Sequence, residues 1–220
     1  MHQKENLTSS FSSHCPLCKA KSEAFSIHSD RLYLRCTFCK SIFLHHEHFP
    51  EPEREKTRYE LHNDPGKTEG YLDFISPVLN ALNEPISGKN KLLDYGAGPH
   101  AFLGGHLEKF GWNVSVYDPF FYPDKIVLEN NYDFILLVEV MEHFHRPAAE
   151  FDHLFSKLKP GGKIVCMTNM HAEKINFDTW YYKNDPTHVF FYHQKAIEFL
   201  AEKHKCSNLK TEGRLIVFTQ

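Results

Sequence analysis

The sequence of 220 residues has no long apolar run and little excess of charge of either sign. Its N-terminal residues lack the apolar core of a signal peptide, and uninterrupted apolar runs such as residues 134–138 are far too short to cross a bilayer. We therefore expect a cytoplasmic protein without a membrane segment. A formal net charge of −3 gives no overall attraction to nucleic acid, although a local basic patch could still bind RNA.

Disulfide bonds are not expected, although the sequence contains six cysteines. No secretory signal supports an oxidising compartment, and four of the cysteines form two Cys-x-x-Cys pairs. The seventeen residues between the pairs are the spacing of a four-thiolate zinc ribbon. The predicted zinc ligands are Cys15, Cys18, Cys36 and Cys39. A hairpin over residues 24–27 and 32–35 and a third strand over residues 41–44 would complete this module.

The predicted zinc ion is structural, because four thiolate ligands leave no open coordination position for catalysis. A module this small has little core, so metal binding would supply most of its folding free energy, on the order of 10 kcal/mol or more. Nearby histidines could form a second metal site, but an exposed polar connector explains them more simply. These histidines are His14, His45, His46 and His48.

Residues 91–100 (KLLDYGAGPH) pass from an apolar run into a glycine-rich bend. The apolar run is typical of a buried parallel strand that ends at Asp94. Gly96 and Gly98 allow the backbone to turn tightly and to approach a ligand without an intervening side chain. A helix predicted over residues 101–110 would direct its free N-terminal N–H groups toward that ligand.

A second strand is predicted over residues 112–117, and Asp118 follows it about twenty residues beyond Gly98. Dinucleotide-binding folds place an acid at this point, where it binds ribose hydroxyls, so a nucleoside ligand is expected. The full G-x-G-x-x-G fingerprint is absent, because Pro99 and His100 follow Gly98. A pyrophosphate cradle therefore fits poorly.

The Asp-x-Gly-x-Gly motif of residues 94–98 resembles the first motif of class I S-adenosylmethionine-dependent methyltransferases, and Asp118 matches their ribose-binding acid. Residues 132–144 (YDFILLVEVMEHF) resemble the family's fourth strand, which a Glu-His pair follows. Residues 158–167 (LKPGGKIVCM) resemble its next turn and fifth strand. The resemblance covers residues 89–220 and implies an α/β fold: a Rossmann-like seven-stranded methyltransferase sheet beside the small N-terminal zinc ribbon with its four cysteines.

The chain is expected to have three parts. Residues 1–48 would form a disordered tail and the zinc ribbon, residues 49–88 a linker and an N-terminal helical segment, and residues 89–220 the S-adenosylmethionine-binding domain. Apolar spacing predicts one helix over residues 71–82 and another over residues 193–204. A closing pair of antiparallel strands is expected at the C-terminal end.

The segment of residues 119–131 is shorter than the family's third helix and third strand require. We expect a clipped crossover with an abbreviated strand over residues 125–128. The usual acid after this strand has no clear counterpart, so adenine would be held by hydrophobic contact, for example with Phe120 or Phe121. A segment before the first motif often covers the cofactor in this family, and the candidates here are Tyr59, His62 and Tyr71.

The resemblance implies S-adenosylmethionine as cofactor. The residues expected around it are Asp94, Gly96, Ala97, Gly98, Asp118, Pro119 and Glu139, of which Glu139 could instead bind the acceptor. Methyl transfer is an in-line displacement, so the enzyme mainly aligns the nucleophile with the methyl carbon. For an oxygen or a weakly acidic nitrogen acceptor a histidine is a natural general base, and His188 and His143 are the candidates. His143 could instead only order its loop.

The aromatic stretch of residues 176–192 suits a pocket wall. It includes a segment similar to one that borders the substrate in small-molecule members of the family. We therefore predict a small-molecule or sugar-like acceptor that is methylated on oxygen or nitrogen. One alternative is an RNA methyltransferase whose ribbon grips the RNA, and another is a non-catalytic scaffold that binds a protein partner. The basic ribbon residues that favour RNA are Lys19, Lys21, Arg31, Arg35 and Lys40.

Overall fold

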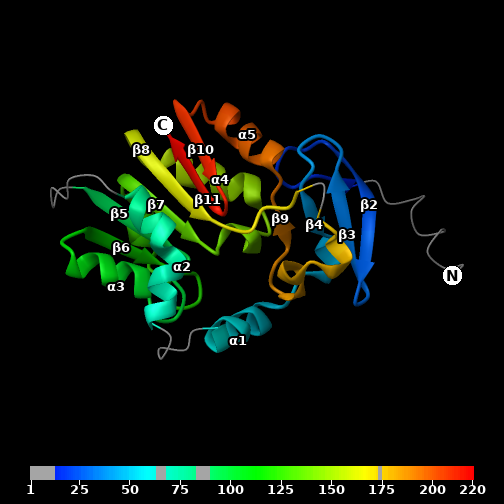
Figure 1. The fold of residues 1–220 in the computed structure, drawn as a ribbon, viewed down its shortest axis with the longest axis horizontal. Helices are drawn as coiled ribbons and strands as arrows, with labels where there is room; N and C mark the ends of the chain where they lie inside the picture. The colour runs from blue at the N-terminus through cyan, green and yellow to red at the C-terminus, as the bar shows by residue number, and fades with distance from the viewer. Residues whose placement is uncertain (1–12, 63–67, 83–89, 173–174) are drawn as a thin grey trace, which may run out of the picture. The chain divides into compact units, whose positions relative to one another are not determined.

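A computed structural model shows two compact units, each assembled from several segments of the chain (Figure 1). The structure describes residues 13–62, 68–82, 90–172 and 175–220. The first unit, called the ribbon unit below, comprises residues 1–50, 142–151 and 169–203. The second, called the sheet unit, comprises residues 51–141, 152–168 and 204–220.

The sheet unit contains a mixed sheet of six strands in the order β10-β11-β8-β7-β5-β6. The neighbouring pairs from β6 to β8 are parallel, whereas β11 and β10 pair antiparallel at the other end. The bounds are Lys91–Tyr95 for β5, Asn113–Tyr117 for β6, Tyr132–Val138 for β7, Leu158–Met167 for β8, Asn208–Glu212 for β10 and Leu215–Thr219 for β11. The predicted α/β class and the closing antiparallel pair are confirmed.

Helices α2, α3 and α5 lie where the sequence predicts helices, whereas α1 and α4 were not predicted. Their bounds are Pro52–His62 for α1, Thr68–Ala81 for α2, Phe102–Lys109 for α3, Pro147–Ser156 for α4 and Gln194–Lys203 for α5. Helix α2 packs Ile75 and Val78 into the core of the sheet unit, and α3 adds Leu103 and Leu107 to it. Helix α1 is strongly charged and lies in a segment that the sequence had suggested was a linker.

The expected strand over residues 125–128 is wrong. These residues belong to a 3-10 helix, Lys125–Glu129, whose first turn is capped by Asp124. The carboxylate of Asp124 accepts a hydrogen bond from the N–H of Ile126 at 2.9 Å, which favours a turn over an extended strand. The sheet of the described residues therefore has six strands rather than the seven that the family resemblance implied.

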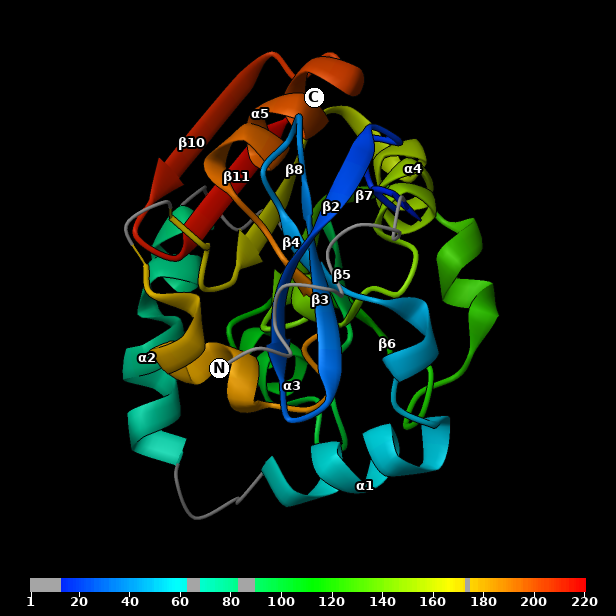
Figure 2. The ribbon, with the colours of Figure 1, turned by 90° about the vertical axis from the view of Figure 1, so that its right-hand side faces the viewer.

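The ribbon unit contains an antiparallel sheet of five strands in the order β1-β2-β3-β4-β9, of which β2, β3 and β4 are labelled in Figure 2. The bounds are Ser13–His14 for β1, Lys21–His28 for β2, Arg31–Cys36 for β3, Ile42–Leu44 for β4 and Phe190–Phe191 for β9. The hairpin and the third strand are confirmed. Strand β9, which pairs with β4 from far along the chain, was not predicted.

Aromatic side chains of the stretch 176–192 form the core of the ribbon unit. Phe177, Trp180 and Phe191 are buried together with Tyr33 of β3. The ring centroids of Tyr33 and Phe177 lie 5.1 Å apart in an edge-to-face arrangement. The stretch that was predicted as a pocket wall therefore packs against the ribbon strands.

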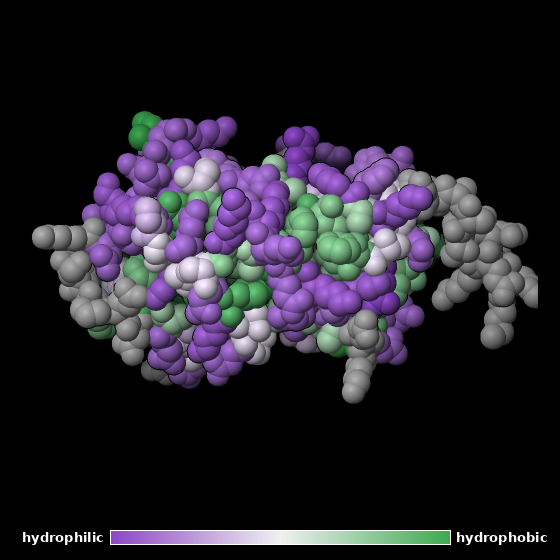
Figure 3. Space-filling model, turned by 90° about the horizontal axis from the view of Figure 1, so that it is seen from above, coloured by the Kyte–Doolittle hydropathy of each residue, from purple (hydrophilic) through white to green (hydrophobic). Residues whose placement is uncertain are grey.

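No helix in the described ranges is both long enough and apolar enough to span a bilayer. The surface in Figure 3 is mainly hydrophilic and is interrupted by smaller hydrophobic areas. The exposed large hydrophobic residues of the described chain are Phe25, Ile27, Phe38, Leu61, Phe74, Phe110, Ile126 and Tyr181.

Candidate functional site

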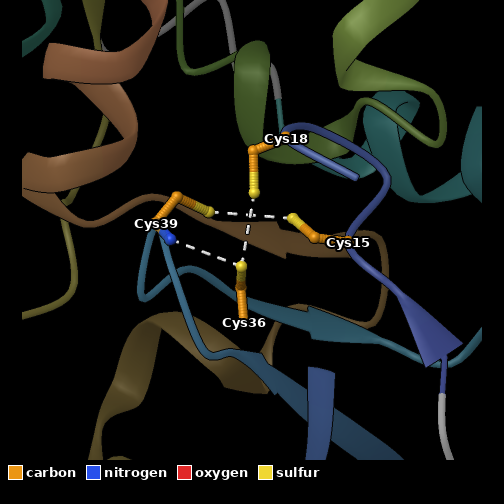
Figure 4. Close-up of side chains that lie close together, drawn as sticks. All are labelled: Cys15, Cys18, Cys36 and Cys39. Atoms are coloured by element: carbon orange, nitrogen blue, oxygen red, sulfur yellow. Dashed lines mark hydrogen bonds between the residues drawn. The ribbon is translucent and has the colours of Figure 1, made fainter. Parts of the chain in front are cut away.

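Four cysteine sulfurs point toward one another at the two turns of the ribbon unit (Figure 4). The Sγ atoms of Cys15 and Cys39 lie 3.7 Å apart, and those of Cys18 and Cys36 lie 3.4 Å apart. Four sulfurs at the usual Zn–S distance would form a tetrahedron with edges of about 3.8 Å. A disulfide would require a distance of about 2.0 Å. The geometry therefore suits one tetrahedral ion and excludes disulfides.

The two Cys-x-x-Cys turns have the same local structure. The N–H of the first cysteine in each turn donates to the carbonyl five residues later, at 2.8 Å for Cys15 and 2.9 Å for Cys36. The residue after each second cysteine has a positive φ, 64° at Lys19 and 61° at Lys40. In the second turn the N–H of Cys39 also donates to the Sγ of Cys36 at 3.3 Å. Such repeated geometry aims two sulfurs from each turn at one point.

The glycine bend of the sheet unit follows β5 and requires its glycines. Gly96 and Gly98 have φ values of +77° and +67°, which side chains disfavour. A Cβ atom at Gly96 would also lie 2.7 Å from the side chain of Val140. The N–H of Gly96 donates to the carbonyl of Tyr117 at 2.8 Å, and the N–H of Gly98 donates to Oδ2 of Asp118 at 2.9 Å. The bend is thus fixed to the end of β6.

Asp94 is buried beneath the bend and supports helix α3. Its Oδ2 accepts a hydrogen bond from the N–H of Gly104 at 2.9 Å, while Ala101 at the helix start provides no side-chain cap. A Cβ at Gly104 would lie 3.1 Å from the side chain of Val116, so this glycine allows α3 to pack closely against β6. Burial raises the pKa of Asp94 to about 7; the Gly104 N–H opposes the rise and the charge of Asp118 adds to it.

Asp118 organises the segment that follows β6. Its Oδ1 accepts hydrogen bonds from the N–H groups of Phe120 at 2.8 Å and Phe121 at 3.1 Å. The ring of Tyr59 on α1 lies 5.8 Å from the ring of Phe120. The two phenylalanines predicted to contact adenine are thus hydrogen-bonded to the ribose-binding candidate, and Tyr59, a candidate for covering the cofactor, lies beside one of them. Ala97 is in the bend, its N–H 3.3 Å from the Tyr117 carbonyl, Pro119 is exposed, and the side chain of His62 falls outside the described part.

Glu139 follows β7 and forms an ion pair that sequence reasoning missed. Its Oε2 lies 2.5 Å from a guanidinium nitrogen of Arg214, in the turn between β10 and β11. Glu139 has a φ of 54°, an uncommon conformation for a residue other than glycine. The pKa of Tyr71 is raised mainly by burial and further by the charges of Asp94 and Glu139, so this phenol stays neutral. A single arginine in a C-terminal hairpin gives no sequence signal for this pairing.

The two predicted catalytic histidines lie together in the ribbon unit. The ring centroids of His143 and His188 are 4.8 Å apart. Nδ1 of His143 lies 2.9 Å from the carbonyl oxygen of Thr187, and Nδ1 of His188 lies 2.6 Å from that of Tyr182. A carbonyl oxygen only accepts, so each Nδ1 carries the hydrogen and, in the neutral ring, each Nε2 carries the lone pair. Both rings are therefore oriented to accept a proton or a metal at Nε2.

Glu142 completes this cluster, and sequence reasoning did not assign it a role. Its side chain is fully buried, and one carboxylate oxygen accepts a hydrogen bond from the hydroxyl of Tyr182. The same oxygen lies 3.9 Å from Nε2 of His188. One ligand atom from each of Glu142, His143 and His188 lies within 4.8 Å of the others. The position of Glu142 directly before His143 was the only available signal.

No further grouping of histidines, cysteines and acids in the described ranges has the spacing of a metal site. A 3-10 helix, His46–His48, follows His45. The ring of His45 contacts those of His46 and His48, but the three side chains do not have the spacing of a metal site. This agrees with a polar connector. His14 is exposed at β1.

Comparison with known proteins gives one family. A family model described as a methyltransferase domain matches residues 58–211. No curated protein sequence matches the chain significantly.

Solved structures share the fold. An O-methyltransferase family protein from Burkholderia thailandensis is 14% identical, with a TM-score of 0.50, over 75% of this chain and 61% of its own. Haemonchus contortus phosphoethanolamine N-methyltransferase 2 is 16% identical, with a TM-score of 0.52, over 64% of this chain and 38% of its own. An S-adenosylmethionine-dependent methyltransferase from Archaeoglobus fulgidus is 15% identical, with a TM-score of 0.53, over 70% of this chain and 94% of its own. The chain thus spans about three fifths or less of the first two proteins, and at these identities the likeness establishes the fold alone.

Proposed function

The chain belongs to the methyltransferase domain family of S-adenosylmethionine-dependent enzymes, and we propose that it transfers a methyl group to an oxygen or nitrogen of a small-molecule or sugar-like acceptor. The observation that carries this proposal is the glycine bend between β5 and α3, which is tied to Asp118 at the end of β6. Bare backbone beside a carboxylate is the arrangement that a nucleoside requires.

The proposed cofactor residues are Asp94, Gly96, Ala97, Gly98, Asp118, Pro119 and Glu139. Asp118 Oδ2 accepts one hydrogen bond from Gly98, and a carboxylate oxygen can accept two, so it can also bind a ribose hydroxyl. Phe120 and Phe121 offer apolar contact for adenine. Asp94 has a positioning role, because its carboxylate is used inside the fold to hold the start of α3. S-adenosylmethionine supplies the electrophilic methyl group, and these residues orient it.

We propose His188 and His143 as the groups that take the acceptor's proton. Their Nδ1 hydrogens are held by backbone carbonyls, so in the neutral rings Nε2 is the basic nitrogen. The buried carboxylate of Glu142 near Nε2 of His188 would stabilise the imidazolium that forms. General-base catalysis of this kind contributes about 10²- to 10⁴-fold in rate. His188→Ala and His143→Ala should therefore lower kcat, and unchanged turnover in both would disprove the assignment.

The four cysteines are proposed to hold a structural Zn²⁺. A closed set of four thiolates gives the ion no position for substrate. Zinc is favoured over iron because four thiolates without redox partners are typical of structural zinc sites.

The contacts of the basic ribbon residues favour a small acceptor over RNA. Lys19 and Lys40 each donate to a backbone carbonyl in their own cysteine turn. Arg31 donates to the carbonyl of Pro186, and Arg35 contacts His171 at 2.8 Å. Cations used within the ribbon unit are less available to phosphates.

Thermal unfolding of the zinc-loaded protein with S-adenosylmethionine or S-adenosylhomocysteine tests the proposal. A ligand at one hundred times its dissociation constant stabilises a protein by about 2.7 kcal/mol, which is several degrees at this size. Asp118→Ala should abolish the shift. Asp73→Ala, an exposed acid on α2, is the matched control and should retain it. Absence of a shift at millimolar ligand would overturn the proposal and favour a non-catalytic scaffold.

A further inference from the structure

We propose that Glu142, His143 and His188 form a second metal site, distinct from the four cysteines, which binds a divalent transition-metal ion. All three residues belong to the ribbon unit. One ligand atom from each lies within 4.8 Å of the others. Ligand atoms on opposite sides of one ion are about 4.2 Å apart, so small side-chain shifts would bring all three onto a single ion. The proposed methyl transfer uses Nε2 of His143 and His188 as proton acceptors in the metal-free protein. The inference goes beyond that function, because the same atoms would bind the ion in the loaded protein.

The hydrogen bonds around the cluster are those that surround metal-binding histidines. A metal-ligating imidazole usually donates its second N–H to a carbonyl or carboxylate, which fixes the tautomer and the ring orientation. His143 does so to Thr187 at 2.9 Å, and His188 does so to Tyr182 at 2.6 Å. Glu142 is oriented in turn by the Tyr182 hydroxyl. All three proposed ligands thus have the outer partners of a metal site.

Burial of the carboxylate gives a second reason. Glu142 has none of its surface exposed, so its carboxylate is shielded from water. Away from water, the attraction between this carboxylate and a divalent ion is stronger than at the protein surface. Glu142 belongs to η4, Met141–His143, and its carboxylate contacts the segment that carries Tyr182 and His188.

The ligand set indicates which ions bind. Two imidazoles and a carboxylate suit Zn²⁺, Co²⁺, Ni²⁺ or Fe²⁺, whereas Mg²⁺ and Ca²⁺ prefer oxygen ligands throughout. Three protein ligands leave at least one coordination position open, as in catalytic zinc sites and in contrast to the four-cysteine cluster. An acceptor hydroxyl bound at that position would have its pKa lowered by the ion. In the loaded protein the ion would take over from the imidazoles the task of ionising the acceptor.

Metal binding by the full chain tests this inference. The protein, with its four-cysteine cluster already filled with Zn²⁺, is dialysed against Co²⁺ in the absence of methyl donor and acceptor, and bound metal is measured by mass spectrometry. We expect one ion more than the cysteine cluster holds, with the weak visible absorption of a nitrogen and oxygen site and no new sulfur-to-metal charge transfer. Because no reactants are present, failure here would be distinguishable from failure of the methyltransferase proposal.

Glu142→Gln and His143→Gln should each weaken binding of the additional ion at least tenfold. Glu142→Gln keeps an oxygen for the Tyr182 hydroxyl, and His143 is only half-buried, so at least one variant should fold; retention of zinc by the cysteines checks this. His46→Gln is the control, because His46 is exposed beside two other histidines. The proposal is overturned if no additional ion binds, if both cluster variants bind it normally, or if His46→Gln alone removes it.

Discussion

Asp94 shows how one buried side chain links stability to pH. In the folded protein burial raises its pKa to about 7, whereas an unfolded chain releases this proton near the ordinary value of about 4. Between these two values the folded state binds more protons. The favourable contribution of the protonated carboxyl is therefore present at low pH and is lost as the pH rises through 7.

Replacing Asp94 with asparagine should remove this dependence while keeping an oxygen for the Gly104 N–H. Relative to the parent, Asp94→Asn should gain free energy of unfolding as the pH rises from 4 to 7, by up to about 1.4 kcal/mol per pH unit. Urea unfolding at pH 5, 6 and 7 measures the difference. Asp73→Asn should show no such trend. A constant difference between parent and Asp94→Asn would show that Asp94 titrates normally.

Two glycines, Gly96 in the glycine bend and Gly105 in the helix α3 that follows it, should respond in opposite ways to replacement by alanine. Gly96→Ala should destabilise the protein by about 1–3 kcal/mol, because its φ of +77° and the 2.7 Å approach to Val140 both oppose a side chain. Gly105→Ala has open space and should stabilise by up to about 1 kcal/mol. Denaturant unfolding of both variants decides this. Equal effects would mean that the bend tolerates a side chain.

At the scale of elements, β9 joins the zinc-binding strands to the segment that carries the histidine cluster. Ile42 and Phe43 of β4 pair with Phe191 and Phe190, and the rings of Phe43 and Phe190 stack with centroids 6.0 Å apart. The N–H of Val189 donates to the carbonyl of Glu142 at 2.9 Å, so the same segment is tied to η4. The ribbon is thus part of the scaffold of the proposed catalytic residues.

Phe191→Ala should weaken the ribbon unit from within. The side chain is buried among Tyr33, Phe177 and Trp180, and removing a buried phenylalanine typically costs about 3–5 kcal/mol. We expect faster transfer of zinc to a chelator, because opening of the core exposes the cysteines. Phe110→Ala, at an exposed site beyond α3, should leave the rate unchanged. Equal rates in both variants would show that β9 does not support the ribbon.

At the scale of the whole molecule, the chain passes between the two units after residues 50, 141, 151, 168 and 203. The cysteines and the histidine cluster share the ribbon unit, whereas the glycine bend and Asp118 belong to the sheet unit. The proposed cofactor site and the proposed proton acceptors therefore depend on different cores.

Loss of zinc should accordingly separate cofactor binding from catalysis. Cys36→Ser removes one of four ligands, and we expect hydrogen exchange to speed up in β3, β4, β9 and the segment around His188. Strands β5 and β7 should keep their protection, and S-adenosylhomocysteine should still bind, while methyl transfer is lost. Cys166→Ser, at a cysteine inside β8, is the control that should retain zinc. Unchanged exchange around His188 would refute the coupling.

Features that depend on local spacing could be predicted from the amino-acid sequence. Each Cys-x-x-Cys turn places its two sulfurs on the same side of the chain. Gly96 and Gly98 after an apolar strand allow the tight turn that follows it. Likewise, apolar periodicity was sufficient for α2, α3 and α5. Asp118 could be placed because it lies a fixed distance beyond the bend in a β-α-β unit.

Contacts between segments that are distant in the sequence were decided only by the tertiary structure. The pairing of β4 with β9, the ion pair of Glu139 with Arg214 and the contact of Tyr182 with Glu142 each join residues dozens of positions apart. No local preference encodes such pairs, because they form only when burial of the whole core outweighs the entropy of closing long loops. The 3-10 helix at Lys125–Glu129 likewise depends on a side-chain cap that competes with sheet pairing.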